Sequence, residues 1–472
     1  MKKQMLYAAF ALLMIVTSCS KKSDDNSTPA GDGMTEVKGD ISTNTKWTAD
    51  KIYFLKGTVY VTDGATLEIE PGTIIKGDKA SKGALVISRG GKIMAEGTAE
   101  KPIVFTSALP AGARAQGDWG GLILLGKAPV NQGVDISIEG IDDDGSGKGK
   151  YGGTVENDNS GVLKYVRVEF AGVALSPDNE INGVTFGGVG NGTTVDYVQV
   201  YRSGDDSFEW FGGSVNAKHL LAIDTWDDDF DTDFGFHGKI QFALAQRLIG
   251  TADYSVSNGF ESDNDAAGSN KTSKTSPVFS NITILGPITA AADAGKQNPS
   301  FQHAAQIRRN SSLSAFNSVF TGFPEGVYID DSKVETAKAT SSNYTSGSLK
   351  FMNNIIYACN SKSNEVKGEN KAAFETDLRA NNTFDNAKYA SDLFKAPGLF
   401  SKDLSKNIGR PDFTLKTGSV AATGAAFTDT KVADAFFEKV DYKGAFGETD
   451  WTAGWAHFDP QSLPYTTPGA VK

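Results

Sequence analysis

The sequence predicts an all-β fold: a single-stranded right-handed parallel β-helix, or solenoid, with loop insertions. Three observations lead to this prediction. Short runs rich in β-forming residues alternate with Gly, Asn and Asp over residues 40–460, and segments with helical periodicity are nearly absent. The longer runs recur at intervals of 22 to 39 residues, as expected of a solenoid. The 52 glycines and 15 prolines describe a folded, turn-rich chain.

The first 18 residues have the pattern of a signal peptide. Lys2 and Lys3 precede an apolar core at residues 5–16, which is shorter than the roughly 20 residues that span a bilayer. Residues 16–19 (VTSC) resemble the lipobox of bacterial lipoproteins, in which the cysteine receives a diacylglycerol. We therefore expect lipidation of Cys19 and attachment to a membrane through that lipid anchor. The alternative is an ordinary secretory signal followed by an incidental cysteine.

Residues 19–39 are expected to form a flexible tether. This segment is polar and lacks apolar periodicity, so it buries too little surface to offset its ordering entropy. The acidic pair Asp24 and Asp25 resembles the export tags of lipoproteins that reach the outer face of the outer membrane. We accordingly expect an outer-membrane, cell-surface location. The solenoid should then occupy residues 40–460, with a C-terminal tail at 461–472.

The spacing of the longer runs separates two repeat architectures. A propeller needs about 40 to 50 residues for each four-stranded blade, and the shortest interval here is 22 residues. Such an interval suits one coil of three short parallel strands, and longer coils then carry loops. Asn281, Asn317 and Asn354 open apolar runs at nearly the same repeat position, which resembles the asparagine ladders of parallel β-helices. The intervals, which begin at Leu163 and end at Leu349, are 32, 22, 23, 39, 36 and 34 residues.

Several short motifs stand out along the chain: 70–77 (EPGTIIKG), 88–99 (SRGGKIMAEGTA), 101–107 (KPIVFTS), 118–126 (DWGGLILLG) and 202–213 (RSGDDSFEWFGG). They resemble motifs of the uncharacterised bacterial β-helix lipoproteins related to the pectin-lyase-like superfamily. The C-terminal segments 442–447 (YKGAFG) and 451–455 (WTAGW) are similar to the ending of that group. The resemblance implies the fold and does not imply one function, because β-helices serve as lyases, hydrolases, adhesins and passive binders.

Charge and cysteine content exclude some classes. The formal net charge of −11 argues against a nucleic-acid partner, which requires a concentrated basic face. Cys19 and Cys359 are the only cysteines, so lipidation of the first leaves no internal disulfide. Cys359 follows a strand-like run and is expected to be a buried thiol. Neither an HExxH, a GxSxG nor a P-loop motif is present in the sequence.

Acidic residues concentrate between Ser203 and Phe236, a segment called here the acidic strip. It holds nine acidic residues and one basic residue, Lys218, which gives a net charge of −8. Strand alternation over residues 226–236 would place the aspartates on one face and the aromatic residues on the core face. The odd positions are Asp227, Asp229, Asp231 and Asp233, and the even positions include Trp226, Phe230, Phe234 and Phe236.

A coil of 22 residues would stack carboxylates from two successive coils. Asp205 would lie over Asp227, and Glu209 over Asp231, at about 4.8 Å. Carboxylates so close repel one another unless a cation intervenes, and Ca²⁺ accepts six to eight oxygen ligands. The predicted calcium ligands are Asp205, Glu209, Asp227, Asp229, Asp231 and Asp233. The alternative is a solvated acidic ridge or a set of turn-capping aspartates.

The sequence is compatible with two functions. The first is binding, in which the solenoid presents a face to a surface glycan or to an outer-membrane protein. The second is catalysis on an acidic polysaccharide, by a calcium-assisted lyase or by a hydrolase with carboxylates about 6.5 to 9.5 Å apart. Arg202, Lys218 and Arg308 are candidate substrate contacts, and Lys239 and Arg309 are further candidates for a lyase base. The sequence assigns no catalytic residue.

Overall fold

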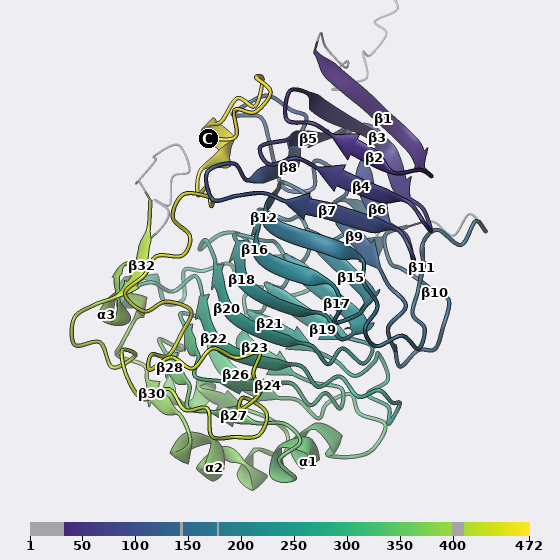
Figure 1. Cartoon of the computed structure of the whole chain (residues 1–472). Coiled ribbons are helices and arrows are strands. Elements are labelled where there is room, and N and C mark those ends of the chain that lie inside the picture. Colours follow the sequence, from purple (N-terminus) through teal and green to yellow (C-terminus); the bar gives the residue numbers. More distant parts are fainter. Residues whose placement is uncertain (1–32, 142–144, 177–178, 399–409) are drawn as a thin grey trace, which may run out of the picture.

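The computed structural model describes residues 33–141, 145–176, 179–398 and 410–472. The predicted signal peptide and the lipidation site Cys19 lie outside these residues. The chain forms a solenoid around a 26-stranded sheet whose pairings are all parallel. Figure 1 shows the strands stacked from β1 (Met34–Ile41) at one end to β27 (Phe351–Met352) near the other. The parallel β-helix expected from the sequence is confirmed.

Strand pairing arranges the sheet in three columns, because each coil contributes one strand segment to each column. Long strands bend and serve two columns. The first column contains β2 (Thr45–Trp47), β4 (Thr66–Ile69), β7 (Lys92–Glu96), the beginnings of β12 (Gly161–Glu169), β16 (Thr194–Tyr201), β18 (Asn216–Ile223), β20 (Lys239–Gln246) and β22 (Val278–Leu285), then β24 (Ser314–Phe316) and β27.

The second column begins with the first halves of β1 and β3 (Ile52–Val61). It continues through β5 (Ile74–Gly77), β8 (Ile103–Ser107), the ends of β12, β16, β18, β20 and β22, then β25 (Val319–Thr321), β28 (Ile355–Tyr357) and β30 (Thr383–Asp385).

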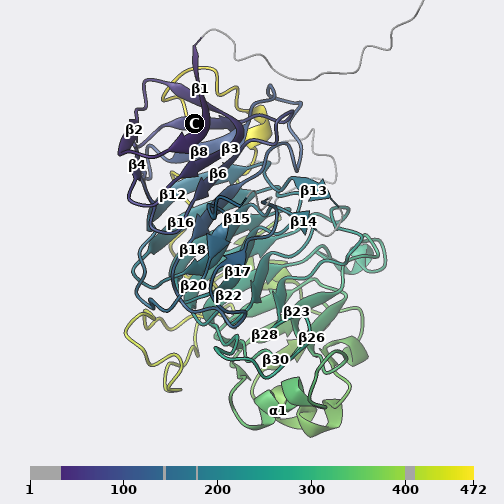
Figure 2. The same cartoon turned by 90° about the vertical axis from the view of Figure 1, so that its right-hand side faces the viewer.

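The third column is seen in Figure 2 with β6, β15, β17, β23 and β26 one below another, and it carries Glu209, Asp231 and Asp233 of the acidic strip. After the ends of β1 and β3 it contains β6 (Ala84–Ile87), β9 (Leu122–Leu125), β15 (Val184–Val189), β17 (Phe208–Gly213), β19 (Phe230–Asp233), β21 (Phe260–Ser262), β23 (His303–Ile307), β26 (Glu325–Ile329) and β29 (Val366–Lys367).

The remaining elements are short and lie in loops or at the end of the solenoid. Among the described residues, no helix is long and apolar enough to span a membrane. The helices are α1 (Ala339–Thr345), α2 (Glu375–Ala380) and α3 (Ala390–Leu393), with 3-10 turns η1 (Ala291–Asp293), η2 (Lys362–Asn364), η3 (Lys371–Ala373) and η4 (Pro460–Ser462). The antiparallel pairs are β10 (Ile136–Ser137) with β11 (Lys150–Tyr151), β13 (Ala174–Ser176) with β14 (Asn179–Glu180), and β31 (Phe394–Ala396) with β32 (Asp412–Leu415).

The register agrees with the repeat spacing over most of the solenoid. Val195 pairs with Ala217, which confirms the 22-residue coil, and Ala315 pairs with Phe351. This coil therefore runs from Ala315 to Phe351, whereas the sequence predicted the start of the next run at Leu349. Leu349 is buried, and its hydrophobicity made it resemble a strand residue although the strand begins at Phe351.

A column of left-handed residues forms the corner between the first and second columns. Tyr165, Tyr197, His219 and Phe242 all have positive φ, and their rings stack with centroid separations of 4.4, 4.1 and 5.3 Å. A left-handed conformation costs on the order of 1–3 kcal/mol for most non-glycine residues. Stacking of large rings offsets part of this cost.

The same corner continues as an asparagine ladder. Asn281, Asn317 and Asn353 have positive φ, and Asn353 Nδ2 donates to Asn317 Oδ1 at 2.7 Å. The predicted member Asn354 is displaced by one position. It lies instead beneath Ser318, whose N–H donates to Asn354 Oδ1 at 2.8 Å. The strand register, which the sequence alone does not define to one residue, places Asn353 in the ladder.

The C-terminal strap, residues 410–472, returns along this corner toward the first coils (Figure 1, yellow). Asn281 Nδ2 donates to the carbonyl of Tyr442 at 2.8 Å, and Trp451 packs edge-on against His219. Tyr465 and Val471 are buried against the apolar side chains of the first coils. The sequence predicted a separate tail at 461–472, and apolar burial instead fixes these residues on the solenoid.

The limits of the solenoid also differ from the predicted ones. Strand β1 begins at Met34, inside the segment expected to be a tether, because it pairs in parallel with β3. The last strand of the large sheet, β30, ends at Asp385, well before residue 460.

Candidate functional site

The outer face of the third column carries a row of acidic side chains. Glu209 of β17 pairs with Asp231 of β19, which pairs with Glu261 of β21. Their neighbours Phe208 and Phe230 are fully buried and stack in the core. Because side chains alternate along a strand, the three carboxylates point outward, one coil above another. The predicted stacking of Glu209 over Asp231 is confirmed.

These carboxylates line an acidic cavity of about 990 Å³. Acidic side chains from the three successive coils of β17, β19 and β21 surround it, together with Glu139 and Glu180 from the segment before β15. Two arginines, Arg308 and Arg309, and one lysine, Lys333, also line it, together with the aromatic residues Trp226 and Tyr254. The cavity therefore combines a concentrated negative charge with basic groups and aromatic surface.

Three groups of carboxylates in this cavity each bring their oxygens within 4.8 Å of one another. Asp206 and Asp231 each belong to two groups, so the groups are contiguous. Asp206, Glu209 and Asp228 are only 7%, 8% and 4% exposed. The groups are Asp205, Asp206 and Asp227; Asp206, Glu209 and Asp231; and Asp228, Asp231 and Glu261.

Hydrogen bonds fix the carboxylates and leave some oxygens unused. Asp206 Oδ1 accepts the N–H of Asp228 at 2.7 Å, and Asp227 Oδ2 accepts the hydroxyl of Ser255 at 2.8 Å. Asp227 Oδ1 and Asp231 Oδ1 are buried without a hydrogen-bond partner in the described part of the chain. A buried oxygen of this kind costs free energy unless a ligand satisfies it.

Burial is the main electrostatic influence on the cavity. It raises the pKa values of Asp206 and Glu209 well above their ordinary range, and neighbouring carboxylates raise them further. It raises the pKa of Asp227 to about 7. It raises the pKa of Asp231 to about 6, although the positive charge of Arg308 opposes this shift. Full ionisation of the cavity at neutral pH is therefore unfavourable without a counter-ion.

Two predicted ligands lie outside the three groups. Asp229 is fully buried and pairs with the buried Arg247, with 3.4 Å between Oδ2 and Nε. Asp233 Oδ1 accepts the N–H of Phe234 at 2.6 Å. For Asp229 the alternation was extended too far, because β19 begins at Phe230 and the residues before it form an irregular segment. Asp233 ends that strand, and its carboxylate is used by the backbone of the next residue.

That irregular segment also changes the position of Trp226. The sequence placed it on the core face, but its side chain is 42% exposed and lines the cavity. Phe234, assigned to the same face, is only partly buried.

The three predicted substrate contacts have different positions. Arg202 does not line the cavity, and its Nε lies 3.1 Å from the buried Asp224 Oδ2. Lys218 projects from the first column and pairs with Glu438 of the strap at 2.8 Å. Arg308 does line the cavity, where it contacts Glu261 and, at 2.8 Å, Asp263.

The remaining lyase-base candidates divide in the same way. Lys239 projects from the first column and pairs with Asp434 of the strap, whereas Arg309 lies in the cavity and pairs with Asp263 at 2.7 Å. Cys359 is a buried free thiol, as expected, and burial raises its pKa to about 12.

Sequence reasoning left Asp206, Asp228 and Glu261 out of the ligand set. A signal was present for two of them, since Asp206 and Asp228 have the same 22-residue separation as Asp205 and Asp227. Glu261 belongs to a longer coil, and the intervening loop concealed its pairing with Asp231.

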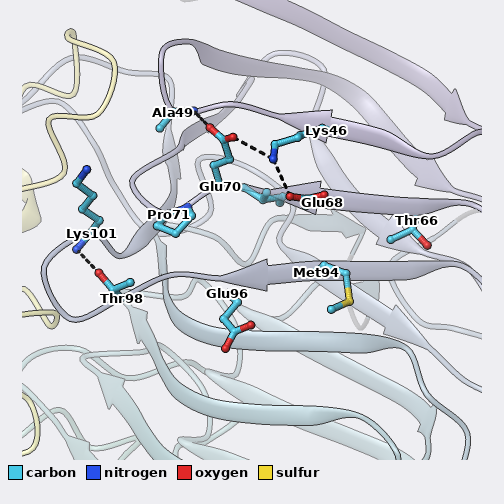
Figure 3. A pocket seen from close by; sticks show the side chains of 11 residues that line it. Lys46, Ala49, Thr66, Glu68, Glu70, Pro71, Met94, Glu96, Thr98 and Lys101 are labelled. Atoms are coloured by element: carbon cyan, nitrogen blue, oxygen red, sulfur yellow. Dashed lines mark hydrogen bonds and ion pairs between the residues drawn. The ribbon is translucent and has the colours of Figure 1, made fainter.

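A second hollow, of about 770 Å³, lies on the first column near the N-terminal end (Figure 3). Lys46 Nζ bridges Glu68 at 2.8 Å and Glu70 at 3.1 Å. Lys46 and Glu68 are exposed and Glu70 is half-buried, so their charges are both paired and solvated. The acidic cavity differs because its carboxylates are buried and crowd one another.

The comparison with known families agrees with this architecture. Residues 39–395 match the pectate-lyase-like β-helix domain, so the chain belongs to that family. A comparison of the sequence with curated proteins found no match. The family establishes the fold, and the function has to be argued from the cavity.

The raised pKa values predict a pH-dependent stability. The pKa values of Asp227 and Asp231, about 7 and 6, exceed the ordinary value of 3.8, so the folded state binds more protons between these limits. Their contribution to stability is present at low pH and is lost as pH rises through the folded pKa values. In chelator, we expect a lower melting temperature at about pH 8 than at about pH 5.

The control is the double substitution Asp227→Asn, Asp231→Asn, which should reduce this pH dependence because it removes two of the titrating groups. A wild-type melting temperature that rises steadily over this range, with no change in the variant, would contradict the assignment.

Proposed function

We propose that the acidic cavity binds a divalent cation, Ca²⁺ by its chemistry, and that cation and cavity together bind an acidic polysaccharide at the cell surface. The observation that carries this proposal is the set of three contiguous carboxylate groups with oxygens within 4.8 Å. The proposal makes the protein primarily a glycan-binding lipoprotein of the outer membrane.

The crowding and burial of the carboxylates support a cation. Coulomb repulsion and desolvation both oppose the ionised state, and one divalent ion relieves both. Ca²⁺ fits because its six to eight oxygen ligands adopt flexible geometries at about 2.3–2.6 Å. The low exposure of Asp206, Glu209 and Asp228 argues against a solvated ridge. One oxygen of Asp206 accepts the N–H of Asp228 in the next coil, which is not a turn cap and leaves the crowding unexplained.

The basic groups of the cavity support an acidic ligand. Arg308 and Arg309 already contact carboxylates, but a guanidinium has five N–H donors and retains capacity for another anion. A cation that keeps open coordination positions would bind the carboxylate of a uronic sugar directly. The family match is consistent with a polysaccharide as the ligand.

A polysaccharide lyase is the second candidate function. Lys333 is exposed and lines the cavity with Arg308 and Arg309, so a basic group is available close to the carboxylates. An inverting hydrolase is a further alternative. Oxygens within one group are closer than the roughly 6.5–9.5 Å between carboxylates in such enzymes, so its two carboxylates would have to come from different groups.

Calorimetric titration tests the cation site. Wild-type protein should bind Ca²⁺, and Asp206→Asn, Asp231→Asn should weaken that binding by more than about tenfold, or about 1.4 kcal/mol. Asp233→Asn is the matched control, because it removes an aspartate from the same strand but outside the three groups. Its affinity for Ca²⁺ should stay close to that of the wild type.

Polygalacturonate, with and without Ca²⁺, then tests the ligand, and neutral dextran serves as its control. We expect the protein to bind polygalacturonate only when Ca²⁺ is present, and not to bind dextran under either condition. Unsaturated products detected by ultraviolet absorbance would identify the lyase instead. Wild-type protein that shows no Ca²⁺ binding heat and no stabilisation by Ca²⁺ would refute the cation site.

The lipid anchor belongs to the same proposal and rests on residues 16–19, which lie outside the described residues. Cys19→Ala should move the protein from the membrane fraction to the soluble fraction, or leave its signal peptide uncleaved. Mass spectrometry of the wild-type N-terminus should show an acylated Cys19. An unmodified wild-type cysteine would contradict the anchor, and protection from protease added to whole cells would contradict surface display.

A further inference from the structure

We propose that Trp226 and Tyr254 form an aromatic wall on which sugar rings stack, so that the cavity selects an acidic oligosaccharide segment over a single uronic acid. This inference rests on the proposed function and specifies its ligand. It assigns the two residues a role in binding the glycan and no role in holding the cation.

The exposure of these two side chains is the first observation. Exposed large hydrophobic residues are few among the described residues: Val134, Val155, Trp226, Tyr254 and Val420. The two aromatic ones, 42% and 74% exposed, both line the acidic cavity. Single exposed apolar residues need no explanation, but two flat aromatic surfaces in one polar cavity indicate a ligand with an apolar face.

The backbone around Trp226 is well held. Its carbonyl accepts the N–H of Asp253 at 2.9 Å and the hydroxyl of Ser257 at 2.6 Å. The next residue, Asp227, accepts the hydroxyl of Ser255. The turns that carry Trp226 and Tyr254 are thus joined to each other and to one of the carboxylate groups. A wall fixed in this way loses little entropy on binding.

The position of the wall relative to the basic residues is the second observation. Trp226 and Tyr254 precede β19 and β21, whereas Arg308 and Arg309 follow β23. Since the strands are parallel, the aromatic wall lies at their N-terminal ends and the arginines lie at their C-terminal ends. The carboxylates of β17, β19 and β21 lie between them.

The volume of the cavity sets the size of the ligand. About 990 Å³ is at the upper end of the range for sites that hold drug-sized ligands, and it is more than one sugar ring fills. A ligand that fills the cavity from the aromatic wall to the arginines must therefore have several sugar units. Its charged groups would meet the cation and the arginines, and a less polar ring face would meet Trp226. The cavity fits a linear acidic glycan that runs along the strands.

Titration with galacturonate trimer and monomer in saturating Ca²⁺ tests this inference. Wild-type protein should bind the trimer at least about tenfold more tightly than the monomer. Trp226→Ala and Tyr254→Ala should weaken trimer binding by about tenfold and leave the affinity for Ca²⁺ unchanged. Trp226→Phe should restore much of the loss, and Val420→Ala, an exposed position outside the cavity, should have no effect.

The outcomes separate this inference from the proposed function. If Trp226→Ala and Tyr254→Ala bind the trimer as tightly as the wild type, the aromatic wall is wrong and the cation and glycan site stands. Equal affinity for monomer and trimer would also overturn the inference. Loss of Ca²⁺ binding in the alanine variants would show a structural role instead. Failure of the wild type to bind any acidic glycan would refute the inference and the glycan part of the proposed function together.

Discussion

In a parallel solenoid, each residue lies over its counterpart in the next coil at about 4.8 Å, and this stacking governs the rest of the structure. Where the sequence repeats a residue type at the interval of one coil, residues of the same type therefore stack on one another. Tyr165, Tyr197 and His219 form a continuous stack of rings at the corner. Asn317 and Asn353 form an amide ladder one step further along the same corner. Rings and amides gain from this arrangement, and the C-terminal strap then covers the corner.

The same stacking has the opposite effect on carboxylates. Glu209, Asp231 and Glu261 gain no attraction from one another, and their burial removes the water that would screen them. The protein pairs only part of this charge: Arg308 contacts Glu261 and Asp263, and Arg309 contacts Asp263. Acidic residues still outnumber basic ones among the residues that line the cavity, and the divalent cation that we propose would balance the excess.

The fold was predictable because the repeat interval and the strand patterns follow directly from the sequence. The stacking of Glu209 over Asp231 was also predictable, since a 22-residue coil without a loop fixes the register. Prediction of individual residue positions failed where the position depended on the strand register to within one residue, or on where a turn ended and a strand began. Asn354 was chosen in place of Asn353, and Trp226 was placed in the core although the strand begins only at Phe230.

Long-range pairing accounts for the other differences. Lys218 pairs with Glu438 of the strap, a contact across 220 positions that no local pattern reveals. Glu261 was not included among the ligands because a loop separates its coil from that of Asp231. The buried Arg202 carries the same charge as Arg308, and only the packing shows that its partner is Asp224 and that it lies outside the cavity.

The most direct test of the account is a pair of crystal structures, one grown with Ca²⁺ and one with chelator. With Ca²⁺, we expect density for one ion or more among Asp206, Glu209 and Asp231, with oxygen ligands at about 2.3–2.6 Å. With chelator, the same carboxylates should move apart or share protons. Identical carboxylate positions in both structures, with only water between them, would contradict the claim that this cavity exists to hold a cation.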